Sequence, residues 1–256
     1  MILKDSVCIV TGSATGIGAA CAELLAAKGA RVAINYTKSE KEARSTAAAC
    51  EAKGVETIVL RADVSSDVDC RRLAHAAVDK WGRIDGLINN AGVTKFAKHA
   101  DLDALDAADF ERIFSVNVIG PFQMVRAVVP AMQKQGTGAI VNISSIAGLT
   151  GMGSSVAYAA SKGALNTMTR SLARALGPAI RVNAVCPGFV ETRWLTSGLG
   201  ESYESQKQNY EAITPLKSVV LPADVADAAL WLLEGAGKVT GETILVDSGV
   251  HLGAPR

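Results

Sequence analysis

The chain has 256 residues, of which 49% are hydrophobic and 20% charged, a composition typical of globular proteins and too apolar for a disordered chain. Lys and Arg number 26 and Asp and Glu number 25, so a net charge of +1 gives no electrostatic reason to expect nucleic acid or an anionic membrane as a partner. We find no signal peptide and no run of 18 apolar residues, and therefore expect a cytoplasmic protein without a membrane span. Five scattered cysteines without a CxxC pair favour free thiols, and three separated histidines form no metal motif.

Short apolar runs alternate with helix-length stretches along the whole chain. Residues 19–27 and 110–128 are predicted as helices, and the predicted strands are residues 7–10, 31–34, 57–60, 86–88, 139–143, 181–185 and 243–246. Such alternation indicates a parallel sheet covered on both faces and doubly wound by right-handed crossovers. We therefore expect an α/β Rossmann fold of about seven strands, with one domain over residues 1–256.

One stretch breaks this alternation, because residues 189–216 contain no apolar strand run. A long connection inside a compact α/β domain is often a lid or a substrate-binding loop. The alternative is a helical insertion at the surface.

A glycine-rich turn follows the first predicted strand. Gly12, Gly16 and Gly18 have the spacing Gly-x-x-x-Gly-x-Gly, which differs from the common Gly-x-Gly-x-x-Gly fingerprint, and they lead directly into the first helix. Glycine lets the backbone approach a ligand closely, and a helix N-terminus offers free N–H groups to a phosphate. The placement favours dinucleotide binding over a purely structural turn.

The end of the second predicted strand bears on which dinucleotide binds. It reads Asn35-Tyr36-Thr37-Lys38-Ser39, with no acidic residue before Glu40. An acid here binds the ribose hydroxyls of NAD and would repel a 2′-phosphate, whereas Lys38 and Ser39 could bind that phosphate. The sequence favours NADP(H), with NAD(H) as the alternative. Lys38 as an ordinary solvated lysine is the competing interpretation.

Tyr158 and Lys162 have the spacing that places two side chains on one face of a helix. A neighbouring ammonium lowers the pKa of a phenol, which could then exchange a proton with a carbonyl or alcohol oxygen. Ser145 follows a predicted strand, where it could donate a hydrogen bond to the same oxygen. Asn117 lies on the predicted helix 110–128, and other strands end in Asn90-Ala91-Gly92 and Pro187-Gly188. Ligands of open α/β sheets bind at such strand ends.

In their order and separations, these motifs resemble those of the classical short-chain dehydrogenase/reductase family over essentially the whole chain. The carriers of the resemblance are Thr11-Gly12-x-x-x-Gly16-x-Gly18, Asp63, Asn89-Asn90-Ala91-Gly92, Asn117, Ser145, Tyr158-x-x-x-Lys162 and Pro187-Gly188. The separation from the tyrosine selects Ser145 rather than Ser144 as the family's serine. Asn35-Tyr36 is similar to NADP-using 3-oxoacyl-[acyl-carrier-protein] reductase-like members, but Thr15 stands where those commonly carry arginine.

The resemblance implies a role for each matched residue. Tyr158 would be the general acid/base, Lys162 would hold the nicotinamide ribose and lower the pKa of Tyr158, Ser145 would polarise the carbonyl, and Asn117 would keep a kinked helix and a water in place. The implied cofactor-binding residues, besides Tyr158 and Lys162, are Gly12, Ser13, Thr15, Gly16, Ile17, Gly18, Asn35, Tyr36, Thr37, Lys38, Ser39, Asp63, Val64, Asn90, Ala91, Gly92, Pro187, Gly188, Val190 and Thr192. The expected substrate-lining residues are Thr94, Lys95, Ala147, Met152, Phe189, Trp194 and Leu195.

The sequence therefore predicts an oxidoreductase that transfers a hydride between NADP(H) and a small-molecule carbonyl or alcohol substrate. The resemblance also implies a homotetramer or homodimer. Two alternatives remain open: an NAD-dependent alcohol, sugar or steroid dehydrogenase of the same family, and a non-catalytic dinucleotide-binding regulator.

Overall fold

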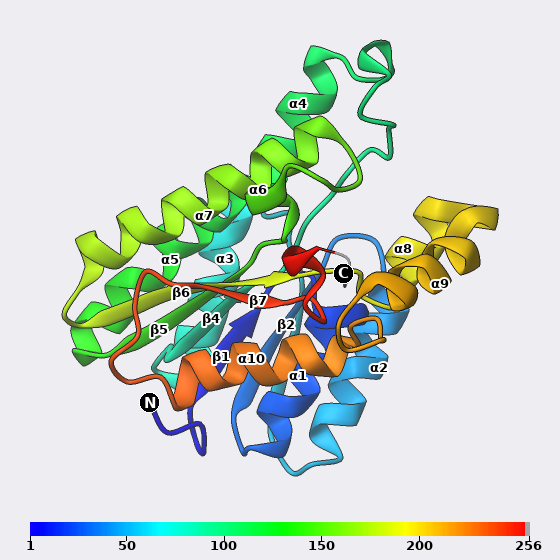
Figure 1. Cartoon of the computed structure of the whole chain (residues 1–256). Helices are drawn as coiled ribbons and strands as arrows, with labels where there is room; N and C mark the ends of the chain where they lie inside the picture. Colours follow the sequence, from blue (N-terminus) through cyan, green and yellow to red (C-terminus); the bar gives the residue numbers. More distant parts are fainter. Residues whose placement is uncertain (254–256) are drawn as a thin grey trace.

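The computed structural model describes residues 1–253 and contains one seven-stranded parallel sheet (Figure 1). Its strands are β1 (Val7–Val10), β2 (Arg31–Tyr36), β3 (Thr57–Arg61), β4 (Gly86–Asn89), β5 (Gly138–Ile143), β6 (Ile180–Pro187) and β7 (Thr243–Val246). The strand order is β3-β2-β1-β4-β5-β6-β7, which confirms the predicted Rossmann fold. The last three residues of the predicted domain 1–256 lie outside the described part of the chain.

Helices cover both faces of the sheet (Figure 1). One face carries α1 (Gly16–Ala27), α2 (Glu40–Glu51) and α10 (Pro222–Glu234), and the other carries α3 (Asp67–Trp81), α5 (Gly120–Gln135) and α7 (Val156–Leu176). Alternate residues of β1 serve the two sides: Cys8 and Val10 join the core under α1 and α10, while Val7 and Ile9 join the core under α3 and α5. All four are fully buried, which explains why a central strand has a continuous apolar sequence.

Four strands continue past the predicted ends at their carboxyl termini, β3 and β4 by one residue and β2 and β6 by two. β2 reaches Tyr36, which pairs with Arg61, and β6 reaches Pro187, which pairs with Val246. The added residues include polar ones such as Asn35, so the apolar pattern ends before the backbone ladder does. These strand ends approach the cavity described below.

The helix predicted over residues 110–128 is longer and interrupted. It comprises α4 (Ala107–Phe114), a π-helical turn (Ser115–Ile119) and α5. The turn contains Asn117, whose buried carboxamide hydrogen-bonds the Val93 backbone, and such bulges often occur at functional sites. Within residues 1–253, the stretch 107–135 is long and apolar enough to cross a membrane, but half of its most apolar window is buried against the fold, as in a core helix.

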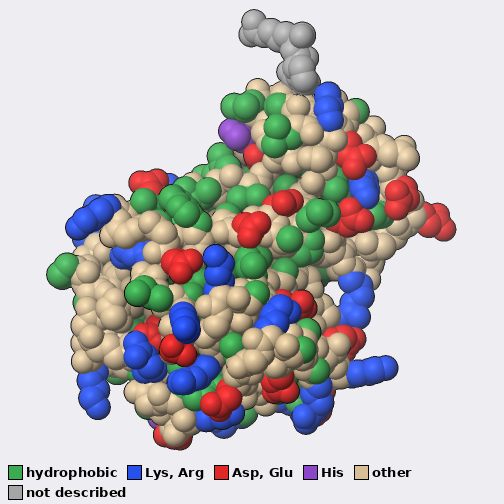
Figure 2. Space-filling view, turned by 90° about the horizontal axis from the view of Figure 1, so that it is seen from below, with side chains coloured by type: hydrophobic (Ala, Val, Ile, Leu, Met, Phe, Trp, Pro, Cys, Tyr) green, Lys and Arg blue, Asp and Glu red, His purple; other side chains and the backbone are tan. Residues whose placement is uncertain are grey.

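Residues 189–216 form a helical lid beside the carboxyl ends of the strands (Figure 1). The lid contains α8 (Arg193–Leu199), a short 3₁₀ turn (Gly200–Ser202) and α9 (Tyr203–Ile213). Thr192 is the N-cap of α8, and its hydroxyl accepts a hydrogen bond from the Leu195 N–H at 3.4 Å. On the face that carries α1, α2 and α10, basic and acidic side chains are interspersed, in keeping with the small net charge (Figure 2).

Candidate active site

A cavity of about 990 Å³ opens at the carboxyl ends of the strands. It lies where the strand order reverses between β1 and β4, the point at which open α/β sheets bind ligands. The glycine-rich turn, the ends of β2 to β6, α7 and the lid all contribute to its wall. One continuous space therefore joins the predicted cofactor-binding and catalytic residues.

The glycine-rich turn has the conformation that an anionic ligand requires. Gly12 and Gly16 have φ values of +61° and +59°, which residues with a Cβ rarely adopt, and a Cβ on Gly12 would lie 2.9 Å from Cα of Ala91. α1 starts at Gly16, and the side chain of Thr15 does not cap it. The first N–H groups of α1 therefore remain available at the cavity wall, where the diphosphate of a dinucleotide would fit.

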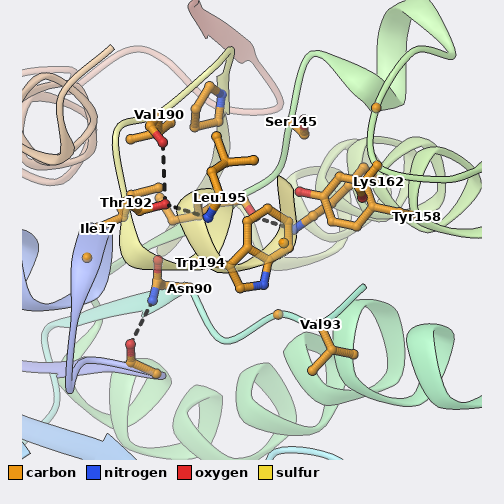
Figure 3. Close-up of a pocket in the computed structure, with 18 of the residues that line it drawn as sticks. Ile17, Asn90, Val93, Ser145, Tyr158, Lys162, Val190, Thr192, Trp194 and Leu195 are labelled. Carbon is orange, nitrogen blue, oxygen red and sulfur yellow. Dashed lines mark hydrogen bonds between the residues drawn. The ribbon is translucent and has the colours of Figure 1, made fainter. Parts of the chain in front are cut away.

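Side-chain hydrogen bonds hold this turn from two neighbouring strands. The Asn90 amide, labelled in Figure 3, donates to the carbonyls of Thr11 and Gly12 at 3.0 Å each. The Thr11 hydroxyl accepts from the N–H groups of Asn90 and Ala91. On the other side, Oδ1 of Asn35 accepts from the Gly12 N–H at 3.0 Å. The turn is thus positioned by side chains at the ends of β2 and β4.

Not every predicted cofactor residue reaches the cavity. Those that line it are Gly12, Thr15, Gly16, Ile17, Asn35, Thr37, Lys38, Asp63, Val64, Asn90, Ala91, Gly92, Tyr158, Lys162, Pro187, Gly188, Val190 and Thr192. Ser13 is buried and donates to the Val10 carbonyl, and Gly18 packs so closely on Gly12 that a Cβ there would collide with its carbonyl oxygen. Tyr36 packs against the core and Ser39 precedes α2, so these four residues shape the site from outside the cavity.

Tyr158, Lys162 and Ser145 meet at one wall of the cavity (Figure 3). Nζ of Lys162 lies 5.5 Å from the ring centroid of Tyr158 and donates to the Ile143 carbonyl at 2.8 Å. Ser155 caps α7 by accepting from the Tyr158 N–H, which fixes the first turn of the helix. The predicted placement of the two side chains on one helix face is therefore realised.

Asn117 connects the end of β4 with α7. Its Oδ1 accepts from the Val93 N–H at 2.9 Å, and its Nδ2 donates to the Val93 carbonyl and to the Ser161 hydroxyl at 2.9 and 3.0 Å. It is fully buried beside Gly92, where a Cβ would come within 3.4 Å of its Oδ1. The Asn117 amide thus fixes the backbone of residues 92–93, which lies next to Lys162.

Burial determines the proton affinities of the two titratable groups. It raises the pKa of Tyr158 to about 12, and a hydrogen bond with Ser145 opposes this shift. It lowers the pKa of Lys162 to about 8. Desolvation of the buried phenol is the largest cause of this raised pKa, and the expected lowering of the Tyr158 pKa by Lys162 stays a prediction. The Tyr158 phenol keeps its proton at neutral pH and can donate it.

Comparisons with known proteins identify the family. Residues 12–251 match the family model described as enoyl-(acyl carrier protein) reductase. A Streptomyces violaceoruber protein described as ketoacyl reductase 2 of the granaticin polyketide synthase is 43% identical over 246 residues, 96% of each chain. L-rhamnose 1-dehydrogenase (NAD(P)(+)) of a Sphingomonas species is 36% identical over 254 residues, 98% of each chain. A crystal structure from Burkholderia xenovorans, described as a short-chain dehydrogenase/reductase, has a TM-score of 0.91 at 42% identity and covers 97% of this chain and 99% of that one. The chain belongs to the short-chain dehydrogenase/reductase family.

In this short-chain dehydrogenase/reductase aromatic rings from the lid and from the loop after β4 pack beside Tyr158. The ring of Trp194, from the lid, lies 5.9 Å from that of Tyr158 and 5.4 Å from that of Phe96, measured between centroids (Figure 3). Phe96 fits against Gly198, where any side chain would overlap its ring. The loop after β4 and the lid therefore pack against each other next to Tyr158.

The substrate-lining prediction holds for four of its seven residues: Met152, Phe189, Trp194 and Leu195 line the cavity. The other three do not. The Thr94 hydroxyl pairs with Ser154, Lys95 forms an ion pair with Asp109 at 2.6 Å, and Ala147 is buried beneath Gly153. Their side chains are engaged with neighbouring protein groups, which the sequence pattern does not reveal.

Several wall residues of this short-chain dehydrogenase/reductase that lie outside the predicted loop 189–216 were not predicted from the sequence. They include Val93, Phe96, Lys98, Arg112, Ile146 and Val250. Phe96 was detectable as an isolated aromatic residue soon after a strand end. Arg193, Leu199, Tyr210 and Ile213 line the cavity from within the predicted loop. No sequence pattern marks Val250 as a cavity residue, because the turn that follows β7 places it there. All five cysteines are buried as free thiols.

Proposed function

We propose that this short-chain dehydrogenase/reductase transfers a hydride between NADP(H) and a carbonyl or alcohol substrate, with Tyr158 as general acid/base. The supporting observation is the joint placement of Tyr158, Ser145 and Lys162 on the wall of the cavity that also contains the uncapped N-terminus of α1. The nicotinamide, when bound, supplies or accepts the hydride. The chain supplies orientation and proton transfer.

In the reducing direction the Tyr158 hydroxyl donates its proton to the substrate oxygen. Its raised pKa keeps that proton in place until the oxygen becomes basic. The Ser145 hydroxyl orients the same oxygen, and the Lys162 ammonium, 5.5 Å from the ring, stabilises the phenolate that remains. Asn117 holds the Val93 backbone and Ser161 of α7, and so keeps the catalytic helix in register with β4.

The charges near the end of β2 support NADP(H) over NAD(H). Thr37 and Lys38 line the cavity there, while the nearest acid, Glu40, lies outside it and is bound by Arg44 at 2.7 Å. A 2′-phosphate at this strand end would therefore meet Lys38, and residues 35–39 place no carboxylate beside it. The substrate we propose is an apolar, small-to-medium carbonyl compound, since its pocket has the Phe96 and Trp194 rings and Met152 in its wall.

The catalytic assignment is tested by Tyr158→Phe. NADPH and NADH would be titrated by fluorescence, and turnover measured on aliphatic, cyclic and aromatic ketones and on 3-oxoacyl thioesters. We expect unchanged cofactor affinity and a kcat lower by about 10²–10⁴-fold, the usual contribution of a general acid. Tyr210→Phe is the matched control, because that hydroxyl also belongs to the cavity wall but bonds the Asp247 carbonyl. Normal turnover by Tyr158→Phe would exclude the mechanism.

A further inference from the structure

An arginine of the lid lines the cavity and reaches across to α2, on the cofactor side of the fold. Arg193 is the first residue of α8, and its Nη1 donates to Oε1 of Glu42 on α2 at 3.1 Å. The preceding residue, Thr192, lies next to the glycine-rich turn, since a Cβ on Gly16 would be 3.5 Å from its methyl group. The Arg193 side chain therefore spans from the glycine-rich turn to α2 and connects the lid with the cofactor half of the fold.

The cavity wall at this rim is positively charged. Arg193 and Lys38 both line it, from the lid and from the end of β2, and Lys38 forms no ion pair within residues 1–253. Glu42 lies outside the cavity wall and contacts Arg193 from there. The acid that does line the cavity, Asp63 at the end of β3, accepts hydrogen bonds from the N–H and hydroxyl of Ser65 through one oxygen.

The contact between Arg193 and Glu42 is easily exchanged. Their side chains are 61% and 39% exposed, and ion pairs this exposed are weak because water and salt screen them. A phosphate presents a higher charge and can accept two parallel hydrogen bonds from one guanidinium. An anion placed between Lys38 and Arg193 would therefore displace the Glu42 carboxylate.

We propose that Arg193 is a specificity-determining residue that leaves Glu42 and binds the 2′-phosphate of NADP(H) together with Lys38. The inference rests on the proposed function, and it adds a lid residue to a site otherwise formed by β2. Thr15 contributes only a hydroxyl on the glycine-rich turn, so Arg193 supplies the second positive charge. Binding of the phosphate then draws the lid towards the cavity, while in the free protein Glu42 holds the guanidinium close to its working position.

The test uses two nucleotides that differ only in the 2′-phosphate and cannot react. Calorimetric titration would compare 2′,5′-ADP with 5′-AMP on the wild type, Arg193→Met and Glu42→Gln. We expect Arg193→Met to weaken 2′,5′-ADP binding by about tenfold, as befits one charge-assisted contact at a partly exposed site, with little change for 5′-AMP. Glu42→Gln removes the competing carboxylate and should strengthen 2′,5′-ADP binding by roughly two- to fivefold.

Lys207→Met is the matched control. Lys207 forms the other exposed ion pair of the lid, with Glu191 at 2.8 Å, and neither residue belongs to the cavity wall. This variant should bind both nucleotides as the wild type does. If Arg193→Met keeps the wild-type ratio of the two affinities, or weakens both nucleotides equally, the assignment of Arg193 to the 2′-phosphate is refuted. A wild type that does not distinguish the two nucleotides would instead refute the NADP(H) preference, before any variant is compared.

Discussion

Replacing Asn35 with alanine should destabilise the fold, because the side chain of this predicted cofactor residue is used internally. Asn35 is 1% exposed; its Oδ1 accepts from the Gly12 N–H at 3.0 Å and its Nδ2 donates to the Ala62 carbonyl at 2.8 Å. The alanine variant therefore leaves one donor and one acceptor without a partner.

The size of the effect follows from these two contacts. A polar group left unsatisfied in the interior costs about 1–3 kcal/mol, so two such groups suggest a loss of about 2–6 kcal/mol in the free energy of unfolding. For a chain of this length each kcal/mol lowers Tm by about 2–4 °C, which gives a decrease of roughly 4–24 °C. Because Gly12 loses one of its anchors, NADPH affinity should fall as well.

Urea and thermal unfolding of Asn35→Ala would be measured beside Thr37→Ala. Thr37 is an exposed residue of the same cavity wall, two positions along, and its side chain forms no hydrogen bond within residues 1–253, so its loss should cost under about 0.5 kcal/mol. Equal stability of the two variants would refute the structural role of Asn35. If Asn35→Ala is as stable as the wild type but binds the cofactor more weakly, Asn35 contacts the cofactor directly, as the sequence predicts.

Two further outcomes are expected. Trp194→Ala should raise KM for cyclic and aromatic ketones by about tenfold or more while NADPH affinity stays unchanged, with Trp231→Phe, at the exposed face of α10, as the control in the same kinetic assay. Lys162→Met should reveal the free-energy cost of burying an ammonium. Burial lowers the pKa of Lys162 from 10.5 to about 8. Between these two pH values the unfolded chain binds more protons than the folded protein, so the free energy of unfolding of the wild type rises with pH. Relative to Lys162→Met, the wild-type free energy of unfolding by urea should rise by about 2 kcal/mol from about pH 8 to about pH 10, and a constant difference would contradict the depressed pKa.

The fold was predictable because burial on both sheet faces leaves a continuous apolar signature. β1 and β7 have the predicted bounds, and the remaining strands differ only at their ends. The interruption at Asn117 was not predictable from periodicity, since residues 110–128 have the composition of an ordinary helix. It arises because the Asn117 amide satisfies the Val93 backbone, a contact between segments that are 24 positions apart.

The spacing of the candidate catalytic residues was predictable from the sequence, but their pKa values were not. The four-residue separation of Tyr158 and Lys162 fixes their common helix face in any α-helix. Their pKa values depend instead on how much water reaches them, and that is decided by Trp194 and the other residues that enclose them. The spacing of two ionisable residues in the sequence thus predicts that their side chains lie close together. The direction of each pKa shift can be predicted only when the packing around the two groups is known.

Specificity depends on the part of the chain where the sequence pattern is weakest. The glycine-rich turn and α7 have local signatures because they are shaped by backbone constraints that only certain residues meet. The lid has none: Trp194 and Arg193 are neighbours in sequence, yet one packs on Tyr158 and the other reaches Glu42. Since consecutive residues of α8 face the substrate and the cofactor rim, a change in how α8 sits alters both at once. The proposed substrate and cofactor contacts therefore share one short helix, and variants selected for one should be measured for the other.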